Sequence, residues 1–295
     1  MAVKAIFKDC FEFKKIGMVH PYQKTCDKYE VSEYDNFFRD IDKNFDLIAI
    51  TGDKPNDKKG LLTGYYEPVI KAYNYPKKGS YPIYKHPKTV SEKIDYKISR
   101  KAINDGHFKN NNLEIAWVEN EIEAFFLHIQ GSGRLLLENN KVIKVRYAGS
   151  NEKSYSSLGK ILIKNGFIKK EEVDMHKIKN WLYKDKKKSR KFMNMNERYI
   201  FFEEYTGEIK GSAKVDLVPN VSVAVDKRFI KRGEAIIIQS TSNKKNIFLG
   251  VAHDEGSAIK GKSRIDLFTG FGYKSEKKAA RLKEKIYTWK LIQKK

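Results

Sequence analysis

The chain has 295 residues and a formal net charge of +22 at pH 7, because 59 lysine and arginine residues outnumber 37 aspartate and glutamate residues. With 40% hydrophobic residues it can build one large core or two ordinary ones, which excludes a disulfide-stapled mini-protein and a globally disordered chain. No segment approaches the roughly 20 consecutive apolar residues of a membrane-spanning helix, and the opening MAVKAIFKDCFEFKK lacks the apolar core of an export signal.

Helical and strand-like patterns alternate in blocks along the chain. Residues 32–45 predict an amphipathic helix, since their apolar side chains recur at helical spacing. From residue 61, short apolar runs between turn residues predict strands, namely LLTGYYEPVI, YPIYK, EIAWV, AFFLHIQ, RLLL and VIKVRY. Helical patterns return between about residues 155 and 199, where Gly166 ends the first and the basic run KDKKKSRK separates the others. AIIIQS and IFLGVA then predict strands, KSEKKAARLKE a helix and IYTWKLI a last strand. This pattern predicts a mainly β protein with a few helices, built from barrels or sandwiches.

The excess of basic residues has two explanations. Lysine, asparagine and isoleucine are frequent throughout, as an AT-rich genome alone would produce. A net charge of this size also attracts nucleic acid, anionic lipid or carboxylate-bearing polymers. The sequence contains none of the common nucleic-acid recognition motifs, so we expect no nucleic-acid partner.

Cys10 and Cys26 are the only cysteines, and neither has a histidine at metal-ligand spacing. We therefore expect no metal site, and nothing in the sequence calls for an organic cofactor. In an oxidising compartment the two thiols could close a short loop, whereas in a cytosol they would stay reduced. The sequence leaves both states open.

The segment GVAHDEGSAIKGKSRIDLFTGFG, residues 250–272, carries the first candidate site. Asp254 and Asp266 each adjoin an apolar strand-like run, so each is either a turn residue or a carboxyl whose pKa is raised by desolvation. The intervening glycines let the backbone approach a bulky polymer, and Lys260 can bind an anionic group or remain a solvated loop lysine.

Two further segments combine polar or aromatic side chains with glycine. In TGYYEP, Tyr65 and Tyr66 offer flat faces to sugar rings, although tyrosine is equally a good strand residue. In QGSGR, three polar residues form a turn that leads into a strand; they are Gln130, Ser132 and Arg134.

Together, these segments give the chain its resemblance to the membrane-bound lytic murein transglycosylase A (MltA) family. The matching blocks follow the family order over about 230 residues, from roughly Leu61 to the end. They are LTGYYEPVI, YPIYK, SRKAI, FFLHIQGSGR, RYAGSNEKSYSSLGKILI, IKGSAKVDLVP, VSVAVDKRFIKRGE and VAHDEGSAIKGKSRIDLFTGFG. The sequence departs from the family pattern at His253, where many members have an apolar residue or threonine.

The resemblance implies a particular fold. Residues 1–85 and 202–295 would form a catalytic double-psi β-barrel domain with an N-terminal helical segment. A second β-rich domain at residues 86–201 would be inserted into it, with a substrate groove between the two.

The resemblance also implies a reaction and a role for each of three aspartates. The β-1,4 bond between N-acetylmuramic acid and N-acetylglucosamine would be cleaved without water, leaving a 1,6-anhydro ring. Asp266 would be the single catalytic residue, first as general acid and then as base. We expect Asp254 to be a supporting carboxylate and Asp226, in VAVDKRF, to have a structural hydrogen-bonding role.

The expected partner is therefore the glycan strand of peptidoglycan, bound by a monomer. The side chains expected to contact it are Tyr65, Tyr66, Gln130, Ser132, Arg134 and Lys260. We expect an exported, periplasmic protein. The sequence does not support an outer-membrane lipid anchor at Cys10, since Cys10 lacks the apolar leader that lipoprotein processing requires. Two alternatives stay open, a peptidoglycan hydrolase (muramidase) on the same fold and a non-catalytic glycan-binding protein.

Overall fold

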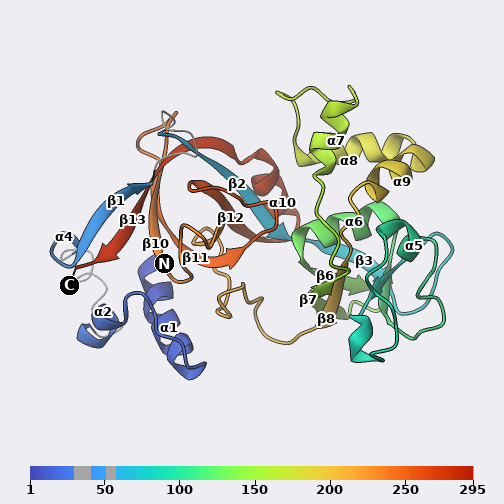
Figure 1. Cartoon of the computed structure of the whole chain (residues 1–295), viewed down its shortest axis with the longest axis horizontal. Helices are drawn as coiled ribbons and strands as arrows, with labels where there is room; N and C mark the ends of the chain where they lie inside the picture. Colours follow the sequence, from blue (N-terminus) through green and yellow to red (C-terminus); the bar gives the residue numbers. More distant parts are fainter. Residues whose placement is uncertain (30–40, 51–57, 295) are drawn as a thin grey trace. The chain divides into compact units, whose positions relative to one another are not determined.

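The structure is a computed structural model that describes residues 1–29, 41–50 and 58–294. It is mainly β with several helices (Figure 1). It divides into two compact units, the first formed by residues 1–65, 208–270 and 277–295, and the second by residues 66–207 and 271–276. Residues 66–85, 202–207 and 271–276, which the resemblance assigned to the barrel, thus fall in the second unit. Among the described residues, no helix has the length and apolar character needed to cross a membrane.

The first unit is built on a closed ring of six strands. Hydrogen-bonded neighbours follow the order β13-β10-β11-β9-β12-β2, and β2 pairs again with β13, while β1 extends the sheet beyond β13. β9 and β11 run parallel, and β13 is antiparallel to β1, β2 and β10. Figure 1 shows the long twisted ribbons of β2 and β13 crossing this unit. The bounds are α1 (Ala2–Lys15), α2 (Gln23–Lys28), α4 (Ile41–Asn44), β1 (Phe45–Ile50), β2 (Gly60–Glu67), β9 (Ser222–Val225), β10 (Ala235–Ser240), β11 (Ile247–Glu255), β12 (Arg264–Phe271), α10 (Gly272–Arg281) and β13 (Lys283–Gln293).

Side chains of successive strand residues point alternately into and out of the ring, and those that point inward are aliphatic. Leu62, Val223 and Leu267 belong to one buried cluster. Because successive strand residues point to opposite faces, their neighbours Thr63, Ala224 and Asp266 point outward. The barrel therefore has an apolar interior and presents polar side chains of β2 and β12 on its outer surface.

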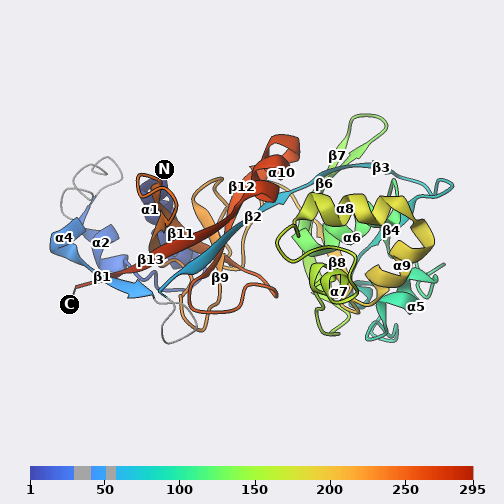
Figure 2. The ribbon, with the colours of Figure 1, turned by 90° about the horizontal axis from the view of Figure 1, so that it is seen from above.

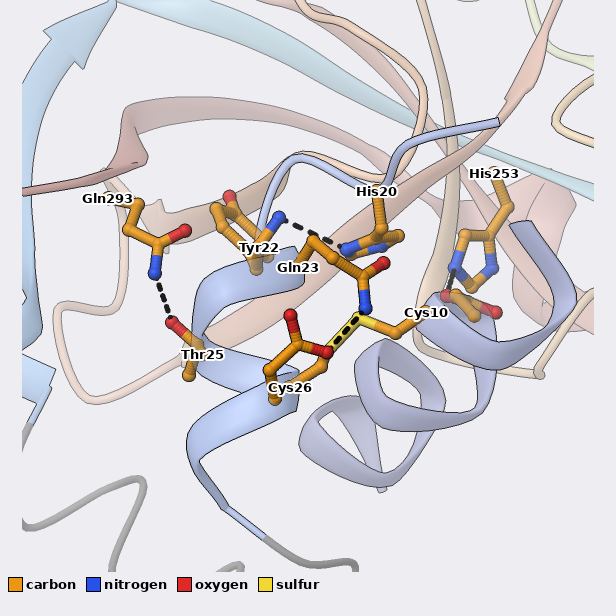
Figure 3. The surroundings of a disulfide bond; sticks show 10 residues. Cys10, His20, Tyr22, Gln23, Thr25, Cys26, His253 and Gln293 are labelled. Carbon is orange, nitrogen blue, oxygen red and sulfur yellow. Dashed lines mark hydrogen bonds and ion pairs between the residues drawn. A yellow bond between two sulfur atoms is a disulfide. The ribbon is translucent and has the colours of Figure 1, made fainter. Parts of the chain in front are cut away.

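A disulfide between Cys10 and Cys26 joins α1 to α2 (Figure 3). It closes a loop with a sequence separation of 16. In the loop-entropy model, a cross-link of this length stabilises the folded state by about 3 kcal/mol. We therefore expect the Cys10→Ser/Cys26→Ser variant to unfold at a lower denaturant concentration than the oxidised protein. Reductant should lower the wild-type midpoint toward that of the variant and leave the variant unchanged; a wild-type midpoint that reductant does not move would contradict the prediction.

The second unit contains a six-stranded sheet in the order β4-β5-β3-β6-β7-β8. Figure 2 shows α6, α8 and α9 close together within this unit. The bounds are β3 (Val69–Tyr73), β4 (Tyr81–Tyr84), the 3-10 helix η2 (Pro87–Thr89), α5 (Arg100–Asn104), β5 (Glu114–Val118), α6 (Glu121–Gln130), β6 (Ser132–Leu137), β7 (Val142–Ser150), α7 (Leu158–Lys164), α8 (Met175–Lys184), α9 (Lys186–Asn194) and β8 (Ile200–Glu204).

The prediction of a strand over AFFLHIQ is wrong, because these residues belong to α6. Asn120 begins the helix by accepting hydrogen bonds from the backbone of Ile122 and Glu123, and Gly131 ends it in the left-handed conformation. Ala124 and Leu127 pack on the sheet, whereas other α6 side chains pack on α7, α8 and α9. A helix buried on both sides is apolar nearly all round, so its sequence lacks the alternation that marks an amphipathic helix.

Two other helix predictions are met only in part. The basic run divides α8 from α9 at Asp185, as expected, but most of it lies within α9, which Asp185 caps by accepting from the backbone of Lys188. The helix predicted over residues 32–45 lies mostly outside the described residues; α4 is helical, but Phe45 starts β1 and pairs with Gln293. The strand predictions for AIIIQS, IFLGVA and IYTWKLI are confirmed by β10, β11 and β13.

Candidate active site

Asp254 and Asp266 lie on strands that flank β9 on its two sides. Asp254 of β11 and Asp266 of β12 are both register partners of Ala224 in β9. Residues in register share a face of the sheet, and the strands lie about 4.8 Å apart, so the two carboxyls project from the same outer face with a small residue between them. Both aspartates are partly exposed, which leaves them accessible to a ligand.

The register of β11 shifts by one residue just before Asp254. Ala252 pairs with Val223 and Asp254 with Ala224, so His253 is the extra residue of a β-bulge. Without the bulge, His253 would stand opposite Ala224 and Asp254 would point into the apolar interior. The bulge therefore decides which side chain of β11 joins Asp266 on the outer face.

Hydrogen bonds hold Asp254 through both carboxylate oxygens. Its Oδ1 accepts from the backbone N–H groups of Ser212, at 3.0 Å, and Glu255, at 2.9 Å. Its Oδ2 accepts from the hydroxyl of Tyr65 at 3.0 Å. Burial raises the pKa of Asp254, against the lowering effect of these donors. Asp254 is thus a fixed carboxyl in a desolvated setting.

Asp266 is held by the hydroxyl of Thr63, which donates to its Oδ1. Burial raises the pKa of this carboxyl and the charge of Asp254 raises it further, whereas the Arg264 guanidinium and the Thr63 hydrogen bond oppose the rise. A carboxyl with a raised pKa retains its proton at a higher pH than an ordinary aspartate does. The environment of Asp266 therefore favours its protonated form more than that of an ordinary exposed aspartate does.

Asp226 has the opposite environment. It lies just after β9, is 3% exposed, and accepts from the backbone and guanidinium of Arg228 and from the backbone N–H of Gly261. The Arg228 hydrogen bonds hold its pKa well below the usual range. Its contacts tie the end of β9 to the loop that precedes β12, where Lys260 is exposed.

The same loop contains a motif that the sequence analysis overlooked. Residues 256–263, GSAIKGKS, match the phosphate-binding pattern GxxxxGK[ST]. That motif requires a helix after the loop, whereas Arg264 starts strand β12. The Gly261 N–H, which a phosphate would need, donates to the Asp226 carboxylate. This geometry excludes a nucleotide-binding loop at these residues.

Other side chains expected to contact the glycan lie in the second unit. The backbone N–H of Tyr66 donates to Oε1 of Gln130 at 3.3 Å, and the Tyr66 ring is only 3% exposed. Ser132 pairs with Arg146 in the β6–β7 hairpin. Arg134 donates to the fully buried Glu67 at 2.9 Å. The structure thus places Tyr66 and Gln130 together and gives Arg134 a buried ionic partner.

Thr63 is a site residue that the sequence analysis missed. It lies two positions before Tyr65 in β2, and residues two apart on a strand share a face. Tyr65 and Thr63 accordingly contact the two neighbouring aspartates, Asp254 and Asp266. The period of two along TGYY is the signal that would have found Thr63.

Two family models match the chain. The MltA specific insert domain matches residues 61–203, and the 3D domain matches residues 221–292. A membrane-bound lytic murein transglycosylase A homolog of Buchnera aphidicola is 35% identical over 244 residues, covering 78% of this chain and 65% of that protein. The transglycosylase A of Vibrio cholerae is 31% identical over 249 residues, covering 80% and 66% respectively. The chain thus spans about two thirds of the length of these curated relatives.

Solved structures agree with these matches. The membrane-bound lytic murein transglycosylase of Agrobacterium tumefaciens has a TM-score of 0.78 at 26% identity and covers 90% of this chain and 80% of that one. Escherichia coli MltA with bound chitohexaose also has a TM-score of 0.78, at 28% identity, covering 87% and 78%. With two family models and the curated relatives in agreement, the chain belongs to the membrane-bound lytic murein transglycosylase A family.

Proposed function

We propose that this chain is a lytic transglycosylase that cleaves the β-1,4 bond between N-acetylmuramic acid and N-acetylglucosamine in peptidoglycan without water. The observation that carries the proposal is the environment of Asp266. This partly exposed carboxyl has a raised pKa, is oriented by Thr63, and lies on the same outer face as Asp254. Family membership supplies the substrate class.

In the proposed reaction, protonated Asp266 gives its proton to the glycosidic oxygen as the bond to C1 of the muramic acid breaks. The resulting carboxylate then takes the proton of the C6 hydroxyl as that oxygen attacks C1. This forms the 1,6-anhydro ring and restores the acid. One carboxyl serves both steps because the nucleophile is already on the substrate, at the high effective concentration of an intramolecular reaction.

Asp254 and Asp226 have supporting roles in this proposal. Asp254 keeps a second negative charge near Asp266, which favours the protonated acid. Its two backbone donors and Tyr65 hold it in one orientation. Asp226 is structural, since its carboxylate is already occupied by Arg228 and Gly261.

We infer further that the six-stranded ring of the first unit has the double-psi topology implied by the family, with the second unit as its substrate-binding insert. The closed pairing order and the parallel β9–β11 pair support this inference. We propose glycan contacts for Tyr65 in the first unit, for Lys260 in its β11–β12 loop, and for Gln130 and Ser132 in the second unit, whereas the buried Tyr66 ring and Arg134, which pairs with the buried Glu67, have structural roles. The substrate also implies that the protein works in the periplasm, and we propose that it does so as a monomer. The bound chitohexaose of the E. coli relative supports a saccharide ligand.

Product mass tests the proposal. Purified peptidoglycan should release disaccharide-peptides that are one water lighter than those released by a muramidase. Products that retain the water would identify a hydrolase and direct the search to a carboxylate that activates water. Binding without any released product would identify a glycan-binding protein instead.

The pH dependence of the reaction follows from the same carboxyl. Since the first step needs protonated Asp266, kcat/KM should fall about tenfold per pH unit above its pKa. Arg264 lowers that pKa, so Arg264→Gln should move the alkaline limb of the profile to higher pH. The measurement is the initial rate of muropeptide release between acidic and mildly alkaline pH. An alkaline limb that stays in place in the variant would belong to another group.

A further inference from the structure

A buried chain of polar groups connects α1 to the strand that carries Asp254. His253 Nε2 lies 2.6 Å from Asp9 Oδ2, and His253 Nδ1 lies 2.7 Å from Ser222 Oγ. The side chains of His253 and Ser222 are fully buried, and Asp9 is 3% exposed. Figure 3 shows the His253 ring directed toward α1, with a dashed line to the carboxylate. The proposed reaction uses none of these three residues.

The order of these groups resembles a hydrolase triad, but their burial excludes that function. A nucleophilic serine must reach its substrate, whereas Ser222 is fully buried in β9. Its Oγ also accepts from the backbone N–H of Val218 at 2.7 Å. One consistent set of protons has the Ser222 hydroxyl donate to Nδ1 and Nε2–H donate to Asp9. The chain of groups thus anchors the His253 ring.

The anchored residue is the bulge of β11. His253 is the extra residue that places its neighbour Asp254 opposite Ala224. Its side chain is held by Asp9 and Ser222, and its carbonyl accepts from the backbone N–H of Ala213 at 2.9 Å. The side chain of His253 is therefore held by α1 and β9, and its backbone is held by the loop that contains Ala213.

The helix also holds the loop that binds Asp254. Lys8 of α1 forms an ion pair with Asp216 at 2.8 Å, and Phe13 packs against Ala213 and Val215. The same loop supplies the Ser212 N–H that donates to Oδ1 of Asp254. Helix α1 therefore contacts both structures that position Asp254, namely the β11 bulge and the loop whose Ser212 N–H donates to it.

We propose that Asp9 and His253 are positioning residues of the reaction, which fix the β11 bulge and thereby hold Asp254 beside Asp266. This inference rests on the proposed function, because it assigns Asp9 and His253 an effect on turnover through Asp254. It gives one side chain of the N-terminal helix, that of Asp9, a part in positioning the site.

The test uses the full chain and soluble uncrosslinked glycan strands. Asp9→Ala removes the acceptor for His253 and should lower kcat about 10-fold to 100-fold with little change in KM, since a misplacement of the order of 1 Å has effects of this size. Asp9→Asn keeps an acceptor oxygen and should retain most of the turnover. Val3→Ala is the matched control, because Val3 is also a buried α1 residue but packs in the cluster of Ala235 and Val251.

A double-mutant cycle separates positioning from a general loss of stability. If Asp9 acts through Asp254, adding Asp9→Ala to Asp254→Asn should lower kcat far less than Asp9→Ala does in the wild type, whereas Val3→Ala should add independently. The inference is overturned if Asp9→Ala keeps the wild-type kcat, or if Asp9→Ala and Val3→Ala reduce kcat in proportion to their losses of stability. Failure of the proposed function looks different, because then the wild type itself yields no anhydro product.

Discussion

Asp266→Asn is expected to lower the rate of anhydro-muropeptide release by about 10²-fold to 10⁴-fold, the usual contribution of a general acid–base residue. Asparagine has nearly the same shape and can still accept from Thr63, but it cannot deliver a proton to the glycosidic oxygen or take one from the C6 hydroxyl. Both proposed steps fail together. The measurement is the initial rate of product release, with product masses checked by mass spectrometry.

The same substitution should not destabilise the fold. Because the folded-state pKa of Asp266 is raised, the folded protein binds more protons than the unfolded chain between the two pKa values, so this carboxyl costs stability as pH rises. At neutral pH the variant should therefore be at least as stable as the wild type, and the difference should shrink at acidic pH. Asp46→Asn, on the exposed strand β1, is the matched control and should keep full activity. An Asp266→Asn variant that is both folded and active would remove Asp266 from the mechanism.

The three aspartates show how environment distributes roles among identical side chains. Burial raises the pKa of Asp254 and Asp266, whereas Arg228 lowers that of Asp226. A carboxylate locked against a guanidinium and a backbone N–H cannot easily accept a proton. Among the three, only the partly exposed pair is suited to proton transfer.

Local sequence patterns predicted the strands of the barrel but not the arrangement of the site. β10 and β13 are recognisable because their branched and aromatic residues have high strand propensity. The meeting of Asp254 and Asp266 at Ala224 depends on the pairing of three strands and on a one-residue bulge. The spacing of the two aspartates in the sequence indicates neither the strand pairing nor the bulge.

Burial explains two further limits of the sequence-based prediction. The sequence of α6 is as apolar as that of a buried strand, because the helix packs against the sheet on one side and against other helices on the other. Arg134 was expected, from the family resemblance, to contact the glycan. Its buried partner Glu67 lies more than sixty residues earlier in the chain, where no local pattern could indicate it.

Arg134→Met is expected to lower the free energy of unfolding by about 3–5 kcal/mol, because it leaves the Glu67 carboxylate buried without its ionic partner. Glu67 is 0% exposed, and the hydroxyl of Tyr205, which donates to it at 2.6 Å, cannot replace a positive charge. Arg134 also lies over the ring of Phe271, at 3.7 Å from its centroid, so methionine retains some of the packing. The measurement is equilibrium unfolding in denaturant.

The neighbouring strand provides a matched control for this prediction. Arg146 of β7 forms a similar pair with Glu203, with 2.7 Å between Nε and Oε1, but its side chain is 37% exposed and that of Glu203 is 50% exposed. Water solvates this pair, so Arg146→Met should cost less than about 1 kcal/mol. Glu67→Gln combined with Arg134→Met should recover part of the loss, since no unpaired charge then remains buried. Equal costs for the two arginine variants would mean that burial of Glu67 does not govern the pair, and Arg134 would then be better explained as a residue that contacts the glycan.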